Sequence, residues 1–531
     1  MIFVTNADGS PTMVTTTQGS VRGVRSCHGL PCVEAFLGIP YAEPPIGKLR
    51  FKKPVPKQPW SEVWNASQLP PACFQRKGNF PRVPWQNDER HSVEDCLYLN
   101  VWVPQEKKGL LPVMVWIHGG SFRMGSTDLD MYSGETLSSY GRVAVVSMNY
   151  RLGSLGFLNG GIPDVPGNMG LWDQHLALQW VKRNIAAFGG DPSRITIFGE
   201  SVGGVSVGIH AVSPLNRGIF NRIIMQSGTP YWALPWENHG ALDRSMRLAK
   251  SVGCVQNNGT TQMDQAIVRC LQELPAEDIL KAELSLFPIH LFTFMPSYGD
   301  ALVPTNPTQA IKEGRMLPVD IMVGSNSDEG TIAFYTLIPE GVPSNWTAQG
   351  MDLNQARTFI SNVFHQFPPA VVQSIIKHYL DDVEPSDSSA VFKAMTDSAG
   401  NFLLDCPTVF AAESFSAHLR NVYGYQFAHR PSVSFWPEAF GVTHTEEIPF
   451  VFGLPVRYNQ RGYSADDTRM SETVMNAWTS FARTGVPELP HAAAWRPYGS
   501  RGHPYALFKH GSVRLQCHLN KRNCDLWRKI F

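Results

Sequence analysis

The stretch Ile195-Thr-Ile-Phe-Gly-Glu-Ser-Val-Gly-Gly204 decides the fold class of this chain. Its first four residues are typical of a buried β-strand, and the apolar residues from Val202 onward continue as a helix. The glycines between them suit a sharp turn, because glycine tolerates positive φ and lets backbones pass closely. Gly199 to Gly203 matches the G-x-S-x-G nucleophile elbow, which is a weak pattern alone and a strong one between a strand and a helix. Ser201 is therefore the candidate nucleophile.

Short β-rich runs and helical patterns alternate on either side of this turn. Strands are predicted at 113–117, 143–148, 321–323 and 422–427, and apolar residues at helical spacing predict a helix over 171–188 that Gly189-Gly190 ends. Strand, helix and strand in this order indicate an α/β fold with a large, mostly parallel sheet flanked by helices. Because no repeat, linker or composition shift marks a boundary, we expect residues 1–531 to form a single domain with long insertions.

Composition and charge exclude several function classes. The chain has 531 residues, 43% of them apolar, and its 45 basic residues balance 45 acidic ones, so we expect no nucleic-acid partner. No run reaches the roughly 18 apolar residues of a membrane span. The opening MIFVTNADGS lacks the parts of a signal peptide, and the last residues resemble no anchor. We expect no membrane span, and a signal or anchor that is absent from this sequence.

Cysteines and glycosylation sequons indicate the compartment. Nine cysteines are present, and three pairs would close one medium, one short and one long loop: Cys73/Cys96, Cys254/Cys270 and Cys406/Cys524. Spacing alone leaves the connectivity open. Cys27 and Cys32 are close enough to pair locally, which would leave Cys517 over. Sequons without proline occur at Asn65, Asn258 and Asn345. Together these features favour a secreted or extracellular glycoprotein over a cytosolic protein.

A serine nucleophile needs an oxyanion hole, a base and an acid. The loop His118 to Phe122 follows a predicted strand and can offer backbone N–H groups, so we expect Gly120, Ser121 and Val202 to form the oxyanion hole. The chain order serine, acid, histidine in this fold restricts the base to the C-terminal part. Sixteen histidines compete for that role, and sequence patterns alone do not complete the choice.

Several segments beyond the elbow strongly resemble the type-B carboxylesterase and cholinesterase family, whose fold is the α/β-hydrolase fold. The similar segments are AFLGIPYAEPPIG (35–47), EDCLYLNVW (94–102), VVSMNYRLGSLGFL (145–158), NMGLWDQHLALQWVKRNIAAFGGDP (168–192), FGESVGG (198–204), SDEG (327–330) and WPEAFGVTHTEEIPFVFGLP (436–455). The resemblance runs from about residue 18 to the final helix near Trp527, so it covers nearly the whole chain.

The resemblance implies the remaining catalytic residues. By position, the family's acid falls on Glu329 in SDEG and its base on His444 in GVTHTEE. It also implies the disulfides Cys73–Cys96, Cys254–Cys270 and Cys406–Cys524, which are the pairs that the loop lengths suggest. The expected chemistry is two-step acyl transfer, in which Ser201 attacks an ester and His444 takes its proton. No cofactor and no metal is expected.

Some positions resemble cholinesterases more than general carboxylesterases. They are Trp85, Tyr132, Glu200 and Glu447, and an aromatic face with a nearby carboxylate would attract a quaternary ammonium group. The alternative is that Trp85 anchors a loop, while Glu200, Ser227 and Glu447 form a network that tunes the base.

Other positions depart from the cholinesterase pattern. Ile332 and Ala333 stand where aromatic residues would line a cholinesterase gorge, and the β-branched Val202 beside the nucleophile could crowd it. Trp232, His290 and Phe292 fall near the expected acyl pocket. The predicted partner is therefore a small-molecule ester, with choline esters as one class and neutral esters of a broad, detoxifying carboxylesterase as the alternative. A non-catalytic adhesion relative such as a neuroligin is a further alternative, and a homodimer is compatible with the sequence.

Overall fold

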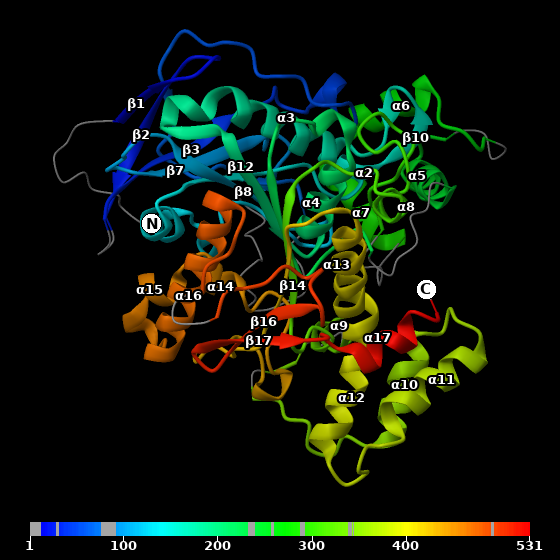
Figure 1. The fold of residues 1–531 in the computed structure, drawn as a ribbon. Helices are drawn as coiled ribbons and strands as arrows, with labels where there is room; N and C mark the ends of the chain where they lie inside the picture. Colours follow the sequence, from blue (N-terminus) through cyan, green and yellow to red (C-terminus); the bar gives the residue numbers. More distant parts are fainter. Residues whose placement is uncertain are drawn as a thin grey trace.

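A 13-stranded sheet forms the centre of the protein, as seen in Figure 1. The computed structural model describes residues 12–27, 31–75, 92–231, 239–255, 260–286, 293–337, 342–343, 345–489 and 493–530. In spatial order the strands are β1 (Thr12–Thr15), β2 (Ser20–Ser26), β3 (Val33–Pro40), β7 (Tyr98–Pro104), β9 (Ala144–Met148), β8 (Leu111–Ile117), β12 (Gly190–Glu200), β13 (Arg222–Gln226), β14 (Asp320–Asn326), β15 (Val422–Phe427), β16 (Pro504–Lys509) and β17 (Ser512–Cys517), with β4 (Trp64–Asn65) beside β2.

The strands from β9 to β16 run parallel to one another. Outside this block, β9 pairs antiparallel with β7 and β16 pairs antiparallel with β17, as does β3 with β7. The predicted α/β fold with a mostly parallel sheet is confirmed. Each predicted strand coincides with one of these central strands. That all of 1–531 forms one domain stays a prediction.

Helices follow the strands in the order that a parallel sheet requires. They are α1 (Glu135–Gly141), α2 (Gly153–Phe157), α3 (Met169–Asn184), α4 (Val202–Val212), α5 (His239–Ser251), α6 (Gln265–Glu273), α7 (Ala276–Leu286), α8 (Pro307–Lys312), α9 (Thr331–Thr336), α10 (Leu353–Val363), α11 (Pro369–Leu380), α12 (Ser388–Gly400), α13 (Cys406–His418), α14 (Ile448–Val451), α15 (Leu454–Arg457), α16 (Ala465–Thr484) and α17 (Lys521–Trp527). The predicted helix over 171–188 is α3 with a 3-10 turn at Ile185–Phe188, and Gly189 ends it at φ 91°.

Alternating side chains of the central strands build a core on each face of the sheet. In β8, Val113 and Val115 pack into the core shared with α3, α4 and α13, while Met114 and Trp116 pack into the core shared with α1 and α16. All four side chains are fully buried. Because both faces are covered, the strands read as continuous apolar runs, which is why the sequence reveals them.

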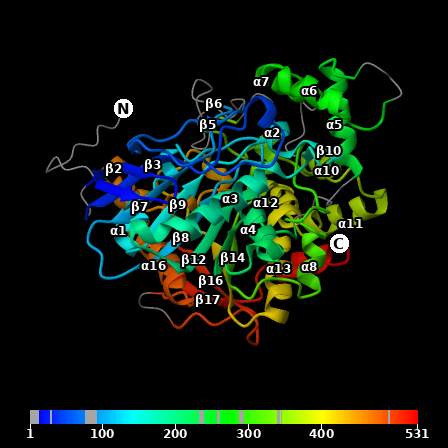
Figure 2. The same cartoon turned by 90° about the horizontal axis from the view of Figure 1, so that it is seen from above.

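Two insertions extend from this framework. Helices α5, α6 and α7 gather with α2 and β10 (Asn159–Ile162) at one end of the molecule, as Figure 2 shows. Helices α10, α11 and α12 pack on one another below the sheet in the view of Figure 1. Long connections between strands therefore become separate helical layers.

Four disulfides cross-link the described residues. They are Cys27–Cys32, Cys73–Cys96, Cys254–Cys270 and Cys406–Cys524, which confirms the predicted pairs. Cys517 is left over and exposed. Within the ranges given above, no helix is both long and apolar enough to cross a membrane.

Candidate active site

The turn between β12 and α4 presents Ser201. Its backbone has φ 56° and ψ −127°, a conformation that is costly for a residue with a side chain and typical of functional turns. The neighbouring glycines are required sterically: a Cβ on Gly203 would lie 2.1 Å from the carbonyl oxygen of Ile117, and one on Gly228 would lie 1.9 Å from that of Ser201. The strand, the strained turn and the helix supply the context that the G-x-S-x-G pattern requires.

Glu329 and His444 are brought together from positions 115 residues apart. The Nδ1 atom of His444 lies 2.7 Å from Oε2 of Glu329, and Oε1 of Glu329 accepts a hydrogen bond of 2.8 Å from the N–H of Asn326. Glu329 is only 1% exposed. A buried carboxylate held in this way fixes the orientation and tautomer of the imidazole.

Asp328 clamps the loop that carries His444 against the turn that carries Glu329. The N–H of Val442 donates to Oδ2 of Asp328 at 3.0 Å, and the N–H of Asp328 donates to the carbonyl of Val442 at 3.0 Å. Gly441 allows this approach, since a Cβ there would lie 2.6 Å from the Asp328 carboxyl. Lys393 on α12 lies 3.1 Å from the same carboxylate. The relative position of acid and base therefore depends on backbone contacts as well as on their own hydrogen bond.

Two further carboxylates surround the imidazole. The Nε2 atom of His444 lies 3.0 Å from Oε1 of Glu200, an ion-pair distance without hydrogen-bond alignment. Glu447 accepts hydrogen bonds from Gln226 at 3.0 Å and from Asn326 at 2.8 Å. Burial lowers the pKa of His444, but the negative charges of Glu200, Glu329 and Glu447 outweigh it and raise that pKa to about 10.

The carboxylates compete for the same proton. Burial raises the pKa of Glu200 well above its ordinary value, and the charge of His444 opposes this shift. Burial also raises the pKa of Glu447, with Glu329 as the next cause. An imidazole and a carboxyl group 3.0 Å apart, each with a raised pKa, titrate as a coupled pair.

Ser201 lies beside this group without a hydrogen bond to it. Among the described residues, no hydrogen bond involves the Ser201 hydroxyl, and Nε2 of His444 faces Glu200 instead. A Cβ on Gly119 would lie 2.8 Å from Oε2 of Glu200 and 3.1 Å from Cβ of Ser201, so one point of the loop touches both residues. Catalytic hydrogen bonds are often long or misaligned in unliganded enzymes and form when substrate binds.

The loop after β8 has an unusual backbone. Gly120, Ser121 and Phe122 all have positive φ, at 101°, 57° and 55°. A Cβ on Gly120 would lie 2.2 Å from the carbonyl of Met124. In the part of the chain that the structure describes, the N–H groups of Gly120, Ser121 and Val202 make no hydrogen bond. Free N–H groups on a strained loop beside a serine can stabilise an oxyanion.

The predicted substrate-binding residues fall into two groups. Tyr132 is buried against Trp116, with ring centroids 5.2 Å apart, and burial followed by the charge of Glu200 raises its pKa. Trp85, Trp232, His290 and Phe292 lie outside the described residues.

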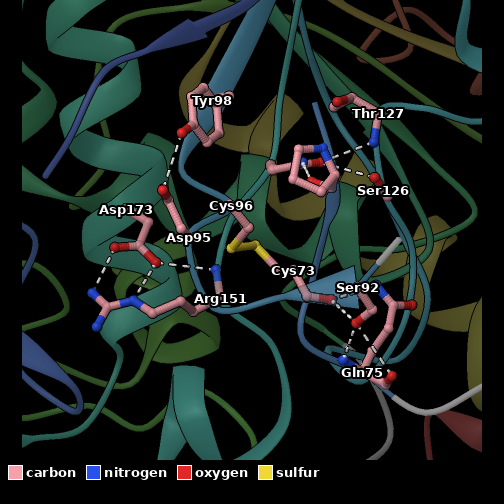
Figure 3. Close-up of a disulfide and its surroundings, with 12 residues drawn as sticks. Cys73, Gln75, Ser92, Asp95, Cys96, Tyr98, Ser126, Thr127, Arg151 and Asp173 are labelled. Atoms are coloured by element: carbon pink, nitrogen blue, oxygen red, sulfur yellow. Dashed lines mark hydrogen bonds and ion pairs between the residues drawn. A yellow bond between two sulfur atoms is a disulfide. The ribbon is translucent and has the colours of Figure 1, made fainter. Parts of the chain in front are cut away.

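The described residues on either side of 76–91 are joined by a disulfide, as Figure 3 shows. The disulfide links Cys73 to Cys96, and Gln75 exchanges two hydrogen bonds with the backbone of Gly125, at 2.8 and 2.9 Å. Nearby, Arg151 donates to Asp173 from Nε at 2.8 Å and from Nη2 at 2.7 Å. Both side chains of this pair are buried.

The residues after Glu329 differ from the aromatic residues that would line a cholinesterase gorge. Ile332 and Ala333 are partly buried at the start of α9. The aromatic residues that follow pack inward: Phe334 lies 5.3 Å from Trp346 and Tyr335 lies 4.9 Å from Trp436, between ring centroids. The two aromatic rings therefore do not replace those expected at 332 and 333.

Several neighbours of the site were not singled out from the sequence. Gln226 and Asn326 end β13 and β14 and bind Glu447 from both sides. Ser325 donates to Asp405 at 2.7 Å, and burial raises the pKa of that carboxyl to about 8. Polar residues at the carboxyl ends of buried parallel strands were the available signal, because ligand sites in α/β sheets lie there. Ser227, proposed for the tuning network, has a buried hydroxyl without a hydrogen bond to any described residue.

Of the three sequons, Asn65 and Asn345 are exposed, and Asn258 lies outside the described residues. Across the described ranges, no group of three or more His, Cys, Asp or Glu side chains is arranged to hold a metal ion.

Comparison with known proteins agrees with this geometry. The sequence profile described as "Carboxylesterase family" matches residues 10–527. The chain belongs to the carboxylesterase family. This carboxylesterase is 38% identical to acetylcholinesterase-1 of Trittame loki over 532 residues, which covers 98% of this chain and 94% of that relative. It is a serine carboxylic-ester hydrolase of cholinesterase-like type, so the predicted family, fold and reaction class are confirmed.

Proposed function

We propose that this carboxylesterase hydrolyses esters by two-step acyl transfer at Ser201, with His444 as general base and Glu329 as the acid behind it. The observation that carries this proposal is the 2.7 Å contact between His444 and Glu329 next to the strained Ser201 turn. In the first step the Ser201 oxygen bonds to the ester carbonyl carbon, its proton passes to His444, and the alcohol leaves with that proton. Water then repeats the sequence on the acyl-enzyme and releases the acid.

Glu200 gives the resting enzyme a place for the extra proton. When the proton resides on Glu200, Nε2 of His444 can accept the proton of Ser201, which requires the imidazole to turn from Glu200 toward the serine. When the imidazolium forms in the transition state, the carboxylates of Glu329 and Glu447 stabilise it. Raised proton affinity at His444 thus assists each chemical step, while the proton on Glu200 keeps the base available.

The N–H groups of Gly120, Ser121 and Val202 are the proposed oxyanion hole. Their freedom from other hydrogen bonds supports this role, because a donor that is already satisfied would have to break a bond during the reaction. Each donor of this kind contributes about 3 to 4 kcal/mol to transition-state stabilisation in other hydrolases.

Choline esters are the proposed substrate class. The buried aromatic ring of Tyr132, and the relative named as an acetylcholinesterase, support this choice over neutral esters. Trp85, Trp232 and Phe292 are proposed to line the same pocket. Ile332 and Ala333 leave it with fewer aromatic contacts than a gorge lined by aromatic residues at both positions.

Turnover of acetylthiocholine, butyrylthiocholine and a neutral aryl acetate, measured side by side, tests this proposal. Ser201→Ala serves as the control for serine-dependent activity, and Trp85→Ala for the cation site. Saturable choline-ester hydrolysis that both substitutions reduce is expected. Aryl-ester turnover alone would support the broad carboxylesterase, and no serine-dependent turnover would support an adhesion or binding protein.

We also propose that the protein is secreted and glycosylated. Four disulfides and the exposed sequons at Asn65 and Asn345 support this. Glycosidase treatment of protein secreted from eukaryotic cells should increase its electrophoretic mobility, and a double Asn65→Gln, Asn345→Gln variant should lose most of that shift. Size-exclusion chromatography with light scattering would test for a homodimer.

A further inference from the structure

Glu283 is a buried carboxylate that the proposed chemistry does not use. It lies on α7, in the helical insertion after the Cys254–Cys270 disulfide, and is only 4% exposed. Ala276, Ile279 and Glu283 are the buried residues of this helix and share one face. A carboxylate at such a position is costly unless polar groups compensate it, so its partners indicate its role.

The partners of Glu283 lie at the start of α2. Oε2 of Glu283 accepts a hydrogen bond of 2.9 Å from the N–H of Ser154. Gly153 has φ 53°, and a Cβ there would lie 3.1 Å from both carboxylate oxygens. Only glycine therefore lets the chain turn at this point and approach the carboxylate so closely.

Helix α2 is bound on its other side to the proposed oxyanion loop. The N–H of Gly153 donates to the carbonyl of Phe122 at 2.7 Å. The ring of Phe122 packs against Phe157 of α2 with centroids 4.9 Å apart. Phe122 directly follows Gly120 and Ser121, whose positive φ values need support from their surroundings.

An electrostatic interaction also links Glu283 directly to the proposed oxyanion loop. Arg123 follows Phe122 and interacts electrostatically with Glu283, which opposes the rise that burial causes in the pKa of this carboxyl. The opposite side of the loop has separate support, because Tyr150 donates to the carbonyl of His118 at 2.8 Å and stacks on its ring. Glu283 and Tyr150 thus hold the two ends of the segment from His118 to Arg123.

We infer that Glu283 is a positioning residue for the oxyanion hole, which it holds in place through α2 and Arg123. The α5 to α7 insertion thereby contributes to catalysis from outside the active site. This inference rests on the proposed function of Ser201 and the loop. It predicts that loss of the carboxylate weakens the transition state more than the binding of substrate.

Steady-state kinetics on a neutral aryl acetate test this inference, because that substrate does not depend on a cation site. Glu283→Ala is expected to lower kcat about tenfold or more while KM changes less than about twofold, since small displacements of catalytic groups act mainly on the transition state. Phosphorylation of Ser201 by an uncharged organophosphate should slow by a similar factor. Glu283→Gln retains an oxygen acceptor for Ser154 and should recover most of the loss.

Two further variants complete the design. Glu277→Ala, at an exposed position of the same helix, should behave as the unsubstituted protein. Gly153→Ala disturbs the same contact from the α2 side and should reproduce the loss of kcat, which keeps the test decisive if Glu283→Ala does not fold. A kcat within twofold of the unsubstituted protein for folded Glu283→Ala, or for Gly153→Ala, would overturn the inference. Absence of Ser201-dependent turnover in the unsubstituted protein would instead overturn the proposed function.

Discussion

Two of the buried charged groups among the described residues of this carboxylesterase are balanced in opposite ways. Arg151 and Asp173 form a matched pair, with one cation and one anion joined by two side-chain hydrogen bonds. Around His444 a single imidazole faces the carboxylates of Glu200, Glu329 and Glu447. A matched pair holds a fixed structure, whereas an excess of carboxylates raises the pKa of the imidazole that they surround.

The difference follows from what each group must do. In the Arg151 pair, a backbone N–H of Arg151 also donates to Asp173 at 3.0 Å, so the charges fix the backbone between β9 and α2. In the His444 group, burial raises the pKa of Glu200 and Glu447 because their charges are not fully compensated. Such unsatisfied electrostatics cluster at functional sites.

The largest effect on activity is expected when the imidazole or the serine hydroxyl is removed. His444→Ala should reduce kcat on a neutral aryl ester by about 10⁴-fold or more, as should Ser201→Ala, because the two residues act as one unit. Stopped assays with radiolabelled substrate give the sensitivity that this range requires. Unchanged thermal unfolding would show that the variants remain folded, and a loss of less than tenfold would contradict the assigned roles.

The next largest effect should appear in stability when the matched pair is broken. Asp173→Asn leaves Arg151 buried without its counter-charge, which should cost about 3 to 5 kcal/mol. Equilibrium unfolding in urea measures this difference. If the variant unfolded within 1 kcal/mol of the unsubstituted protein, the pair would not be a structural anchor.

The elements that the sequence predicted are those with local signals. Strands such as β8 and β12 are apolar throughout because both faces of the sheet are covered, and the glycines around Ser201 are dictated by backbone contacts within the turn. Cysteine positions suggested loops that the structure closes as disulfides. In each case the pattern that predicts the feature involves residues close together in the sequence, or a single residue type.

Residues whose roles depend on spatial neighbours were harder to find. Glu329 and His444 lie 115 residues apart, and only the family resemblance selected them among the acids and histidines. Gln226, Asn326 and Glu283 were not predicted, because their contacts depend on which strand ends and helices lie side by side. The sequence position of a single amide or carboxyl group does not show which residue it contacts in the fold.

A smaller effect is expected from removing one excess charge near His444. Glu200→Gln should lower the pKa of His444, because the first of the charges that raise it is lost. The neutral, catalytically competent imidazole would then persist to lower pH, so the acid limb of the pH profile of kcat/KM should move down by about one unit or more.

The same variant separates this effect from substrate attraction. Measured with a neutral aryl ester, the shift should appear without a contribution from a cationic substrate, and Ser201→Ala should give no profile at all. An acid limb that stays in place or moves upward would contradict the electrostatic role of Glu200.

The smallest effect on stability and activity should come from removing one charge of a solvent-exposed ion pair. Arg522 and Asp382 lie 2.6 Å apart with side chains 71% and 76% exposed. Solvent screens such pairs, so Asp382→Asn should change neither the unfolding midpoint in urea nor kcat measurably. A destabilisation comparable to that of Asp173→Asn would show that burial does not set the difference between the two pairs.

The formation of a phosphoryl adduct on Ser201 tests the central claim most directly. The intact protein is mixed with one equivalent of an uncharged organophosphate and analysed by mass spectrometry, with peptide mapping of the product. We predict a single adduct on Ser201, formed at a rate that falls by orders of magnitude in His444→Ala. An adduct on another residue, or the same rate without His444, would contradict the account.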